Sequence, residues 1–193
     1  GEVTLYRTTL TGNTASAGAG AYNMHGRLNV DSSSFLGNIA SDSGGGIALG
    51  GGWPYPVGGT VGIVNSTFSG NTANYGAGMV SYGENESTIA YSTFSGNDAQ
   101  TAGGGFYQLY GTMKMTGVVF ASVGGNCSGI EPVSDGYNLS SDSTCGFSKP
   151  SDNLATDPML HALADNGGTT RTHAPAAGSP LIEAGAASCY ATD

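Results

Sequence analysis

Hydrophobic and polar positions follow the same order at several places along the chain. Four eight-residue segments align without gaps, at 8–15, 33–40, 66–73 and 92–99, and a fifth at 118–125 aligns more weakly. Each segment carries one apolar anchor, and the anchors are Leu10, Phe35, Phe68, Phe94 and Phe120. Successive anchors are 25, 33, 26 and 26 residues apart, so the chain is built on an internal repeat.

The residues before each anchor predict a strand. Five and seven positions before Phe35 stand Val30 and Leu28, with the polar Asn29 between them, and the other repeats follow the same alternation. A period of two is typical of a strand with one buried face. Glycine follows two residues after the anchor and asparagine three residues after, which indicates a tight turn.

Together these columns predict an all-β fold: a right-handed parallel β-helix, or β-solenoid, of about five coils with an irregular C-terminal cap. Residues 1–125 form the coils, with an insertion loop at 50–59 that explains the one long spacing, and 126–193 form a capping segment continuous with the solenoid in a single domain. The five anchors should stack as one buried column. An asparagine ladder should run through Asn13, Asn38, Asn71 and Asn97.

The periodic pattern stops near Phe120, and we expect the following tail to cover the last coil. Its apolar candidates for that cover are Leu154, Met159, Leu160, Leu163, Leu181 and Ile182. Segment 155–165 is expected to contain one helical turn, with Asp157 as its N-cap and Pro158 at the first position. At the other end, Val3 and Leu5 already occupy inward columns with no polar cap before them.

The composition of the chain limits the classes of partner that it can bind. Hydrophobic residues make up 38% of the chain, it carries 34 glycines, and its formal net charge is −9 with only 5 Lys and Arg. A nucleic-acid binder needs a basic face, which these residues cannot supply. No apolar run reaches about 18 residues, so we expect no membrane span.

The coil segments and the tail resemble a known group. Repeats of the form NSTFSGNTA followed by GAG are similar to those of bacterial surface right-handed β-helix proteins of the pectin-lyase-like superfamily, and also to polymorphic outer membrane protein repeats. The tail segments 126–147 and 154–193 resemble the C-terminal part of choice-of-anchor Q domain proteins. The resemblance implies an exported protein, extracellular or at the cell surface, and assigns no reaction.

The three cysteines fit that setting. Cys127 and Cys145 lie 18 residues apart in a loop-rich segment, and a disulfide is the leading interpretation for such a spacing in an exported chain. A metal site is the weaker alternative, because no second Cys or His pair accompanies them. Cys189 is left as an unpaired thiol, either free or joined to a partner chain or a further extension.

Catalytic chemistry is not expected from the sequence. A polysaccharide lyase or hydrolase needs clustered carboxylates, with Ca²⁺ or as an acid pair, and an adjacent cation. The acidic residues of the coils occupy different columns: Asp31, Asp42, Glu84, Glu86 and Asp98. We therefore expect no catalytic residue, metal site or cofactor, with Ca²⁺ as the alternative.

Two surface features allow binding. Trp53 and Tyr55 stand in the insertion, either as a loop that stacks on a sugar or partner or as side chains folded back on the neighbouring coil. Hydroxyls also flank the anchors, as at Thr9 and Thr11, but this Thr-x-Thr pattern fades along the repeats.

We therefore predict a secreted or cell-surface structural and adhesive solenoid. The uncapped first coil favours either upstream coils or head-to-tail stacking with copies of itself into a filament. The alternatives are a carbohydrate-binding or carbohydrate-active β-helix, with surface polysaccharide as partner, and an ice-binding solenoid.

Overall fold

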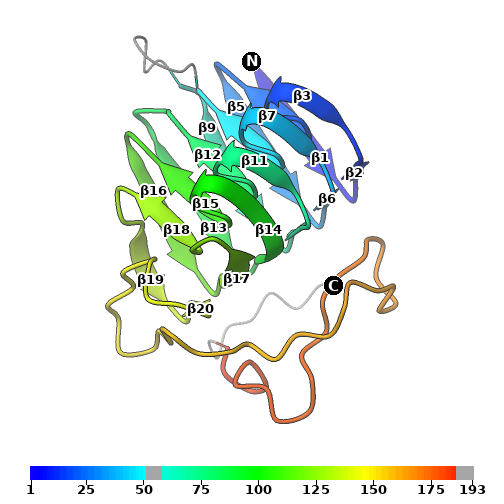
Figure 1. Ribbon diagram of the computed structural model, residues 1–193, viewed down its shortest axis with the longest axis vertical. Coiled ribbons are helices and arrows are strands. Elements are labelled where there is room, and N and C mark those ends of the chain that lie inside the picture. The colour runs from blue at the N-terminus through cyan, green and yellow to red at the C-terminus, as the bar shows by residue number, and fades with distance from the viewer. Residues whose placement is uncertain (51–57, 186–193) are drawn as a thin grey trace.

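The computed structural model describes residues 1–50 and 58–185. Within these residues the chain is all-β without a helix, and its strands stack in parallel to form three sheets (Figure 1). Each coil contributes one strand or more to every sheet, so the chain is a parallel β-helix. The fold class predicted from the repeat is confirmed.

The first sheet, sheet A, contains β1 (Glu2–Tyr6), β5 (Arg27–Asp31), β9 (Thr60–Val64), β13 (Glu86–Ala90), β16 (Thr112–Thr116) and β19 (Val133–Gly136). Sheet B contains β2 (Thr9–Thr11), β6 (Ser34–Leu36), β10 (Thr67–Ser69), β14 (Thr93–Ala102), β17 (Val119–Val123) and β20 (Leu139–Ser140), and also β3 (Thr14–Ala17), β7 (Ile39–Ser43) and β11 (Thr72–Tyr75). Sheet C contains β4 (Ala21–Asn23), β8 (Ile47–Leu49), β12 (Met79–Ser81), β15 (Phe106–Gln108) and β18 (Cys127–Gly129).

The anchor residues lie in one register along sheet B. Phe68 pairs with Phe35 on one side and with Phe94 on the other, and Phe94 pairs with Phe120. Their ring centroids are 4.7, 4.4 and 4.9 Å apart, and all four rings are fully buried. Leu10 pairs with Phe35 but is only partly buried, because it belongs to the first described coil.

A ladder of asparagines fixes the turn that follows the anchors. Nδ2 of Asn13 donates to Oδ1 of Asn38 at 2.9 Å, Asn38 donates to Asn71 at 3.0 Å, and Asn71 donates to Asn97 at 2.8 Å. The ladder continues to Oγ of Ser122 at 3.4 Å, where the fifth repeat has no asparagine. Each amide therefore pairs with its counterpart one coil away instead of remaining an unsatisfied buried group.

A second polar ladder was not predicted from the sequence. Two residues before each anchor, Oγ of Ser33 accepts from the backbone N–H of Thr8, Ser66 accepts from Ser33, and Ser92 accepts from Ser66, each at 3.1 Å. The repeated serine at this position was visible in the sequence, and its role becomes clear only once the coils are in register.

The repeat glycines adopt the turn geometry that the pattern indicates. The column Gly12, Gly37, Gly70 and Gly96 has φ of 64°, 58°, 63° and 62°. This is the left-handed region that favours glycine. The long spacing between repeats falls between β8 and β9, where the insertion at 50–59 lies. Trp53 and Tyr55 belong to 51–57 and lie outside the described residues.

Parallel pairing continues past residue 125, through β18, β19 and β20. The Cys127–Cys145 disulfide is present, with the two Cα atoms 4.7 Å apart. It holds the next loop against the end of the core, where Phe147 contacts Phe120 with ring centroids 6.3 Å apart. Cys189 lies outside the described residues.

The prediction of which residues cover the last coil is mostly wrong. Of the six, only Leu154 packs against the core cluster, while Met159 and Ile182 are 41% and 50% exposed. The disulfide brings Cys145 and Phe147 to the end of the core first, so they take the place of the later leucines.

The prediction of a helical turn at 155–165 is also wrong. This segment has no helix and forms isolated bridges instead, Leu160 with Pro175 and Ala164 with Thr172. Asp157 accepts a hydrogen bond from the backbone N–H of Met159 at 2.8 Å, a local turn with no helix after it.

Beyond Leu154 the tail turns back along the side of the solenoid, below the stacked strands in Figure 1. Oγ of Ser34 donates to the carbonyl of Arg171 at 3.1 Å, and Nε2 of His173 lies 2.9 Å from Oγ of Ser69. Ser34 is fully buried and Thr67 is 4% exposed. The hydroxyl row considered for ice binding therefore does not form an open flat face.

Candidate functional site

One outward column of sheet C includes two tyrosines. The outward residues of β4, β8, β12 and β15 are Tyr22, Ala48, Val80 and Tyr107, which are in register with one another. Ala48 and Val80 point away from the core, yet they are 1% and 0% exposed. Larger neighbouring side chains therefore cover the middle of this sheet.

A hollow of about 350 Å³ opens over this face. We call it the tyrosine groove, and it is lined by Ala17, Tyr22, Asp42, Ser43, Ala48, Gly50, Tyr82 and Leu109. Tyr75 and Tyr107 adjoin it, with ring centroids 5.5 Å apart. Ligand sites are commonly of this size and combine apolar or aromatic walls with a few polar groups.

Tyr82 is the half-buried centre of this group. Burial raises the pKa of its phenol, a hydrogen bond with the Ser43 side chain opposes the rise, and the charges of Asp42, Tyr107 and Tyr75 add to it. The phenol therefore stays protonated at neutral pH. The four side chains that affect this pKa come from β7, β11 and β15, so three strands contribute to the surroundings of Tyr82.

The groove has polar character on one side only. Asp42 on β7 is exposed and is the one charged residue among those lining it. The described residues offer Asp42 no ion pair within 4.0 Å. Tyr22, which also lines the groove, is 47% exposed. Aromatic walls, hydroxyls and a carboxylate are groups that can hold a polyhydroxylated ligand.

The insertion leaves sheet C beside this groove. Gly50, which follows β8, lines the groove, and its N–H donates to the carbonyl of Asn23 at 2.8 Å. The sequence interpretation singled out the insertion, whose Trp53 and Tyr55 lie outside the described residues, and missed the tyrosines that line the groove.

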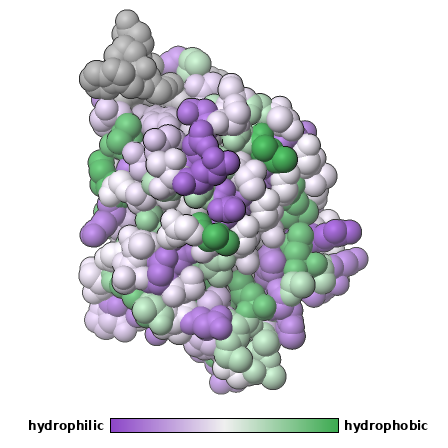
Figure 2. Space-filling model, viewed as in Figure 1, coloured by the Kyte–Doolittle hydropathy of each residue, from purple (hydrophilic) through white to green (hydrophobic). Residues whose placement is uncertain are grey.

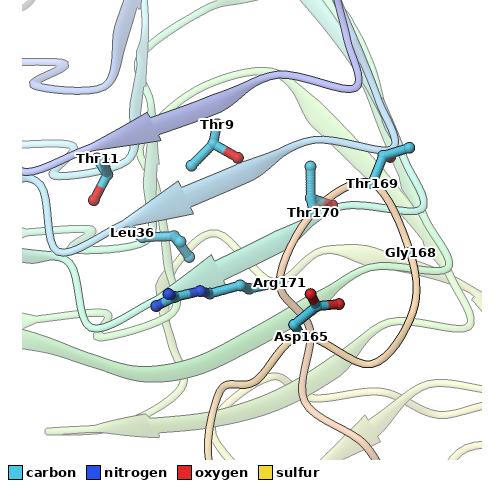
Figure 3. A pocket seen from close by; sticks show the side chains of 8 residues that line it. All are labelled: Thr9, Thr11, Leu36, Asp165, Gly168, Thr169, Thr170 and Arg171. Atoms are coloured by element: carbon cyan, nitrogen blue, oxygen red, sulfur yellow. The ribbon is translucent and has the colours of Figure 1, made fainter.

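A second hollow of about 440 Å³ lies between β2 and the returning tail (Figure 3). Thr9, Thr11 and Leu36 form its floor, and loop 165–171 forms its wall, with Arg171 stretched across the sheet. Asp165 lines it as well, but its Oδ1 accepts from the backbone N–H of Gly167 at 3.0 Å and so stabilises the loop itself.

Further pairs of polar and charged side chains lie on sheet A. Asn29 and Glu2 are joined by a hydrogen bond, and Lys114 pairs with Glu86 at 2.9 Å, both on the outward face of sheet A. In the described ranges, no group of three or more His, Cys, Asp or Glu side chains is arranged to hold a metal ion.

Two findings bear on the wider setting. Residues 1–50 and 58–185 contain no helix long and apolar enough to cross a membrane. Comparison with family models, with curated proteins and with solved structures finds no match to this chain. The arrangement of residues in the groove is therefore what bears on function.

Proposed function

We propose that this protein is a structural and adhesive β-solenoid that binds saccharides in the tyrosine groove. The observation that carries the proposal is the convergence of Tyr22 and Tyr82 with Asp42 and Ser43 around one open hollow. The stacked coils supply a rigid support, since every strand around the hollow is held in a parallel ladder.

The chemistry of the groove suits a sugar. The apolar face of a pyranose ring packs against an aromatic ring, while carboxylate and hydroxyl groups hydrogen-bond the sugar hydroxyls. Figure 2 shows apolar residues scattered among polar ones on the face seen in Figure 1, with no broad apolar patch there.

A binding role is favoured over hydrolysis. Glycoside hydrolysis by the common mechanisms requires two carboxyl groups across one bond. Among the described residues, one carboxylate lines the tyrosine groove and one lines the hollow beside the tail. An exported setting fits the Cys127–Cys145 disulfide, which needs an oxidising compartment to persist. End-to-end assembly stays a prediction.

Binding is tested by titrating the purified chain with cellotetraose, N-acetylchitotetraose and the glucosamine tetramer in a calorimeter. Tyr22→Ala should weaken binding about tenfold, the effect of removing an aromatic contact worth somewhat more than 1 kcal/mol. Tyr6→Ala is the matched control, since Tyr6 is 53% exposed in the same coil but lies on sheet A. Equal affinities for the two variants, or no binding of any tetramer, would reject the proposal.

A further inference from the structure

The charge that lines the tyrosine groove is negative. Asp42 is the single charged residue among the described residues that line it, and none of these is Lys or Arg. Two of the chain's cations are engaged on sheet A, where Arg27 lies 3.9 Å from Glu2 and Lys114 pairs with Glu86. The guanidinium of Arg7 lies over the ring of Tyr6, 4.9 Å from its centroid. Among the described residues, the Asp42 carboxylate has no ion pair within 4.0 Å.

Aromatic faces add to this preference. Tyr22 and Tyr82 line the groove, and the tilted pair Tyr75 and Tyr107 adjoins it. A ring face attracts a cation through its quadrupole, and an ammonium enclosed by several rings beside a carboxylate gains from both interactions. Asp42 and Tyr82 both line the groove, and the Asp42 carboxylate contributes to the raised pKa of Tyr82.

From this arrangement we propose that the groove selects saccharides that carry a protonated amine, with a glucosamine unit placing its ammonium between Asp42 and the tyrosine rings. The inference rests on the proposed saccharide binding and names its ligand class. It also predicts that sugars with carboxylates are disfavoured, because Asp42 would face a like charge without a cation to offset it. The net charge of −9 attracts cationic ligands from a distance.

The test compares two ligands that differ in charge and in the acetyl group. The glucosamine tetramer and N-acetylchitotetraose are titrated into the full chain at about pH 5.5, where the sugar amines are protonated. An exposed ion pair and a cation–π contact act together on the charged tetramer, so it should bind about tenfold more tightly. Its advantage should shrink in high salt, which screens an exposed pair.

Two variants assign the effect to one residue. Asp42→Asn should abolish the preference for the glucosamine tetramer while binding of N-acetylchitotetraose persists. Asp98→Asn is the matched control, since Asp98 is also exposed on sheet B and its substitution changes the net charge equally. Thermal unfolding of both variants checks that the fold is retained.

The outcomes separate this inference from the proposed function. If both tetramers bind equally and binding still depends on Tyr22, saccharide binding stands and amine selection is overturned. A preference that survives Asp42→Asn, or that Asp98→Asn removes as well, also overturns it by showing a general charge effect. If neither tetramer binds, both proposals fall.

Discussion

The coils and the tail of this protein are held together in different ways. In the coils, each residue type repeats at the same place, so one interaction recurs from coil to coil, as in the stack of Phe35, Phe68 and Phe94. In the tail, each contact occurs once. The Cys127–Cys145 disulfide and the hydrogen bond between Ser34 and Arg171 have no counterpart elsewhere in the described chain.

This difference has an energetic consequence. A coil residue contacts like residues on both sides, so a substitution there disturbs three coils and cannot be absorbed locally. A tail residue such as His173 contacts Ser69 and the carbonyl of His161 at exposed or half-buried positions. The coils should therefore set global stability, while the tail responds locally.

The largest effect is expected at the centre of the coils. Phe68→Ala removes a fully buried ring that stacks between Phe35 and Phe94. Truncation of a buried aromatic side chain leaves a cavity and should lower the free energy of unfolding by about 3–5 kcal/mol. Chemical denaturation measures it, and a loss below about 1 kcal/mol would show that the ring column does not carry the core.

The disulfide is the strongest single constraint on the tail. Replacing both Cys127 and Cys145 by alanine opens a loop of 18 residues and should lower the free energy of unfolding by about 3 kcal/mol. Circular dichroism should still report the strands of residues 1–125, because only β18, β19 and β20 lie within this loop. Collapse of the strand signal together with the loop would contradict the separation between the two regions.

The polar ladders allow a direct comparison. Asn71→Ala removes a fully buried amide that donates to Phe35 and Asn97 and accepts from Asn38. Leaving such partners unsatisfied costs about 1–3 kcal/mol. His173→Ala removes one hydrogen bond between tail and coil and should cost less than about 1 kcal/mol. Paired denaturation curves decide this, and equal losses would argue that the two regions are supported alike.

Acid should act on the tail before the coils. Burial raises the pKa of Asp142, but hydrogen bonds from Thr144, Asn126 and Ser140 outweigh it and leave the pKa below its usual 3.8. Because the folded pKa is lowered, the stabilisation is present above about pH 4 and is lost as pH falls through the folded value.

Asp142→Asn should reduce this acid dependence, whereas Asp135→Asn, at an exposed carboxylate on β19, should leave it unchanged. Hydrogen exchange of residues 140–154 at several pH values measures the effect. Protection that is insensitive to acid in the unaltered chain would contradict the role of Asp142.

The repeat predicted the coils because residues at the same repeat position have the same structural role in each coil. The spacing of Phe35, Phe68 and Phe94 places their rings in register. The matching positions of Asn38 and Asn71 predict the asparagine ladder from the sequence alone. The path of the tail could not be predicted from the sequence, because contacts such as that of His173 with Ser69 span 104 residues and occur once. Local turn signals at Asp157 predicted a helix that tertiary contacts replace.

The tyrosine groove was missed for a related reason. Tyr22 and Tyr107 occupy one outward column but are separated by Ala48 and Val80, so the column does not look repeated. Tyr82 and Asp42 come from other positions and converge only when coils stack. The signal that could have found the groove is the position directly after the inward residues Ala21, Ile47, Met79 and Phe106.

The most direct measurement maps the saccharide onto the chain. Two-dimensional NMR of the labelled protein, titrated with the glucosamine tetramer, reports which amides shift on binding. The account predicts saturable shifts at β4, β7 and β8, which carry Tyr22, Asp42 and Ala48, and at Tyr82. It predicts little change near Thr9 and Arg171 in the other hollow. Shifts confined to loop 165–171, or no saturable shifts, would contradict saccharide binding in the tyrosine groove.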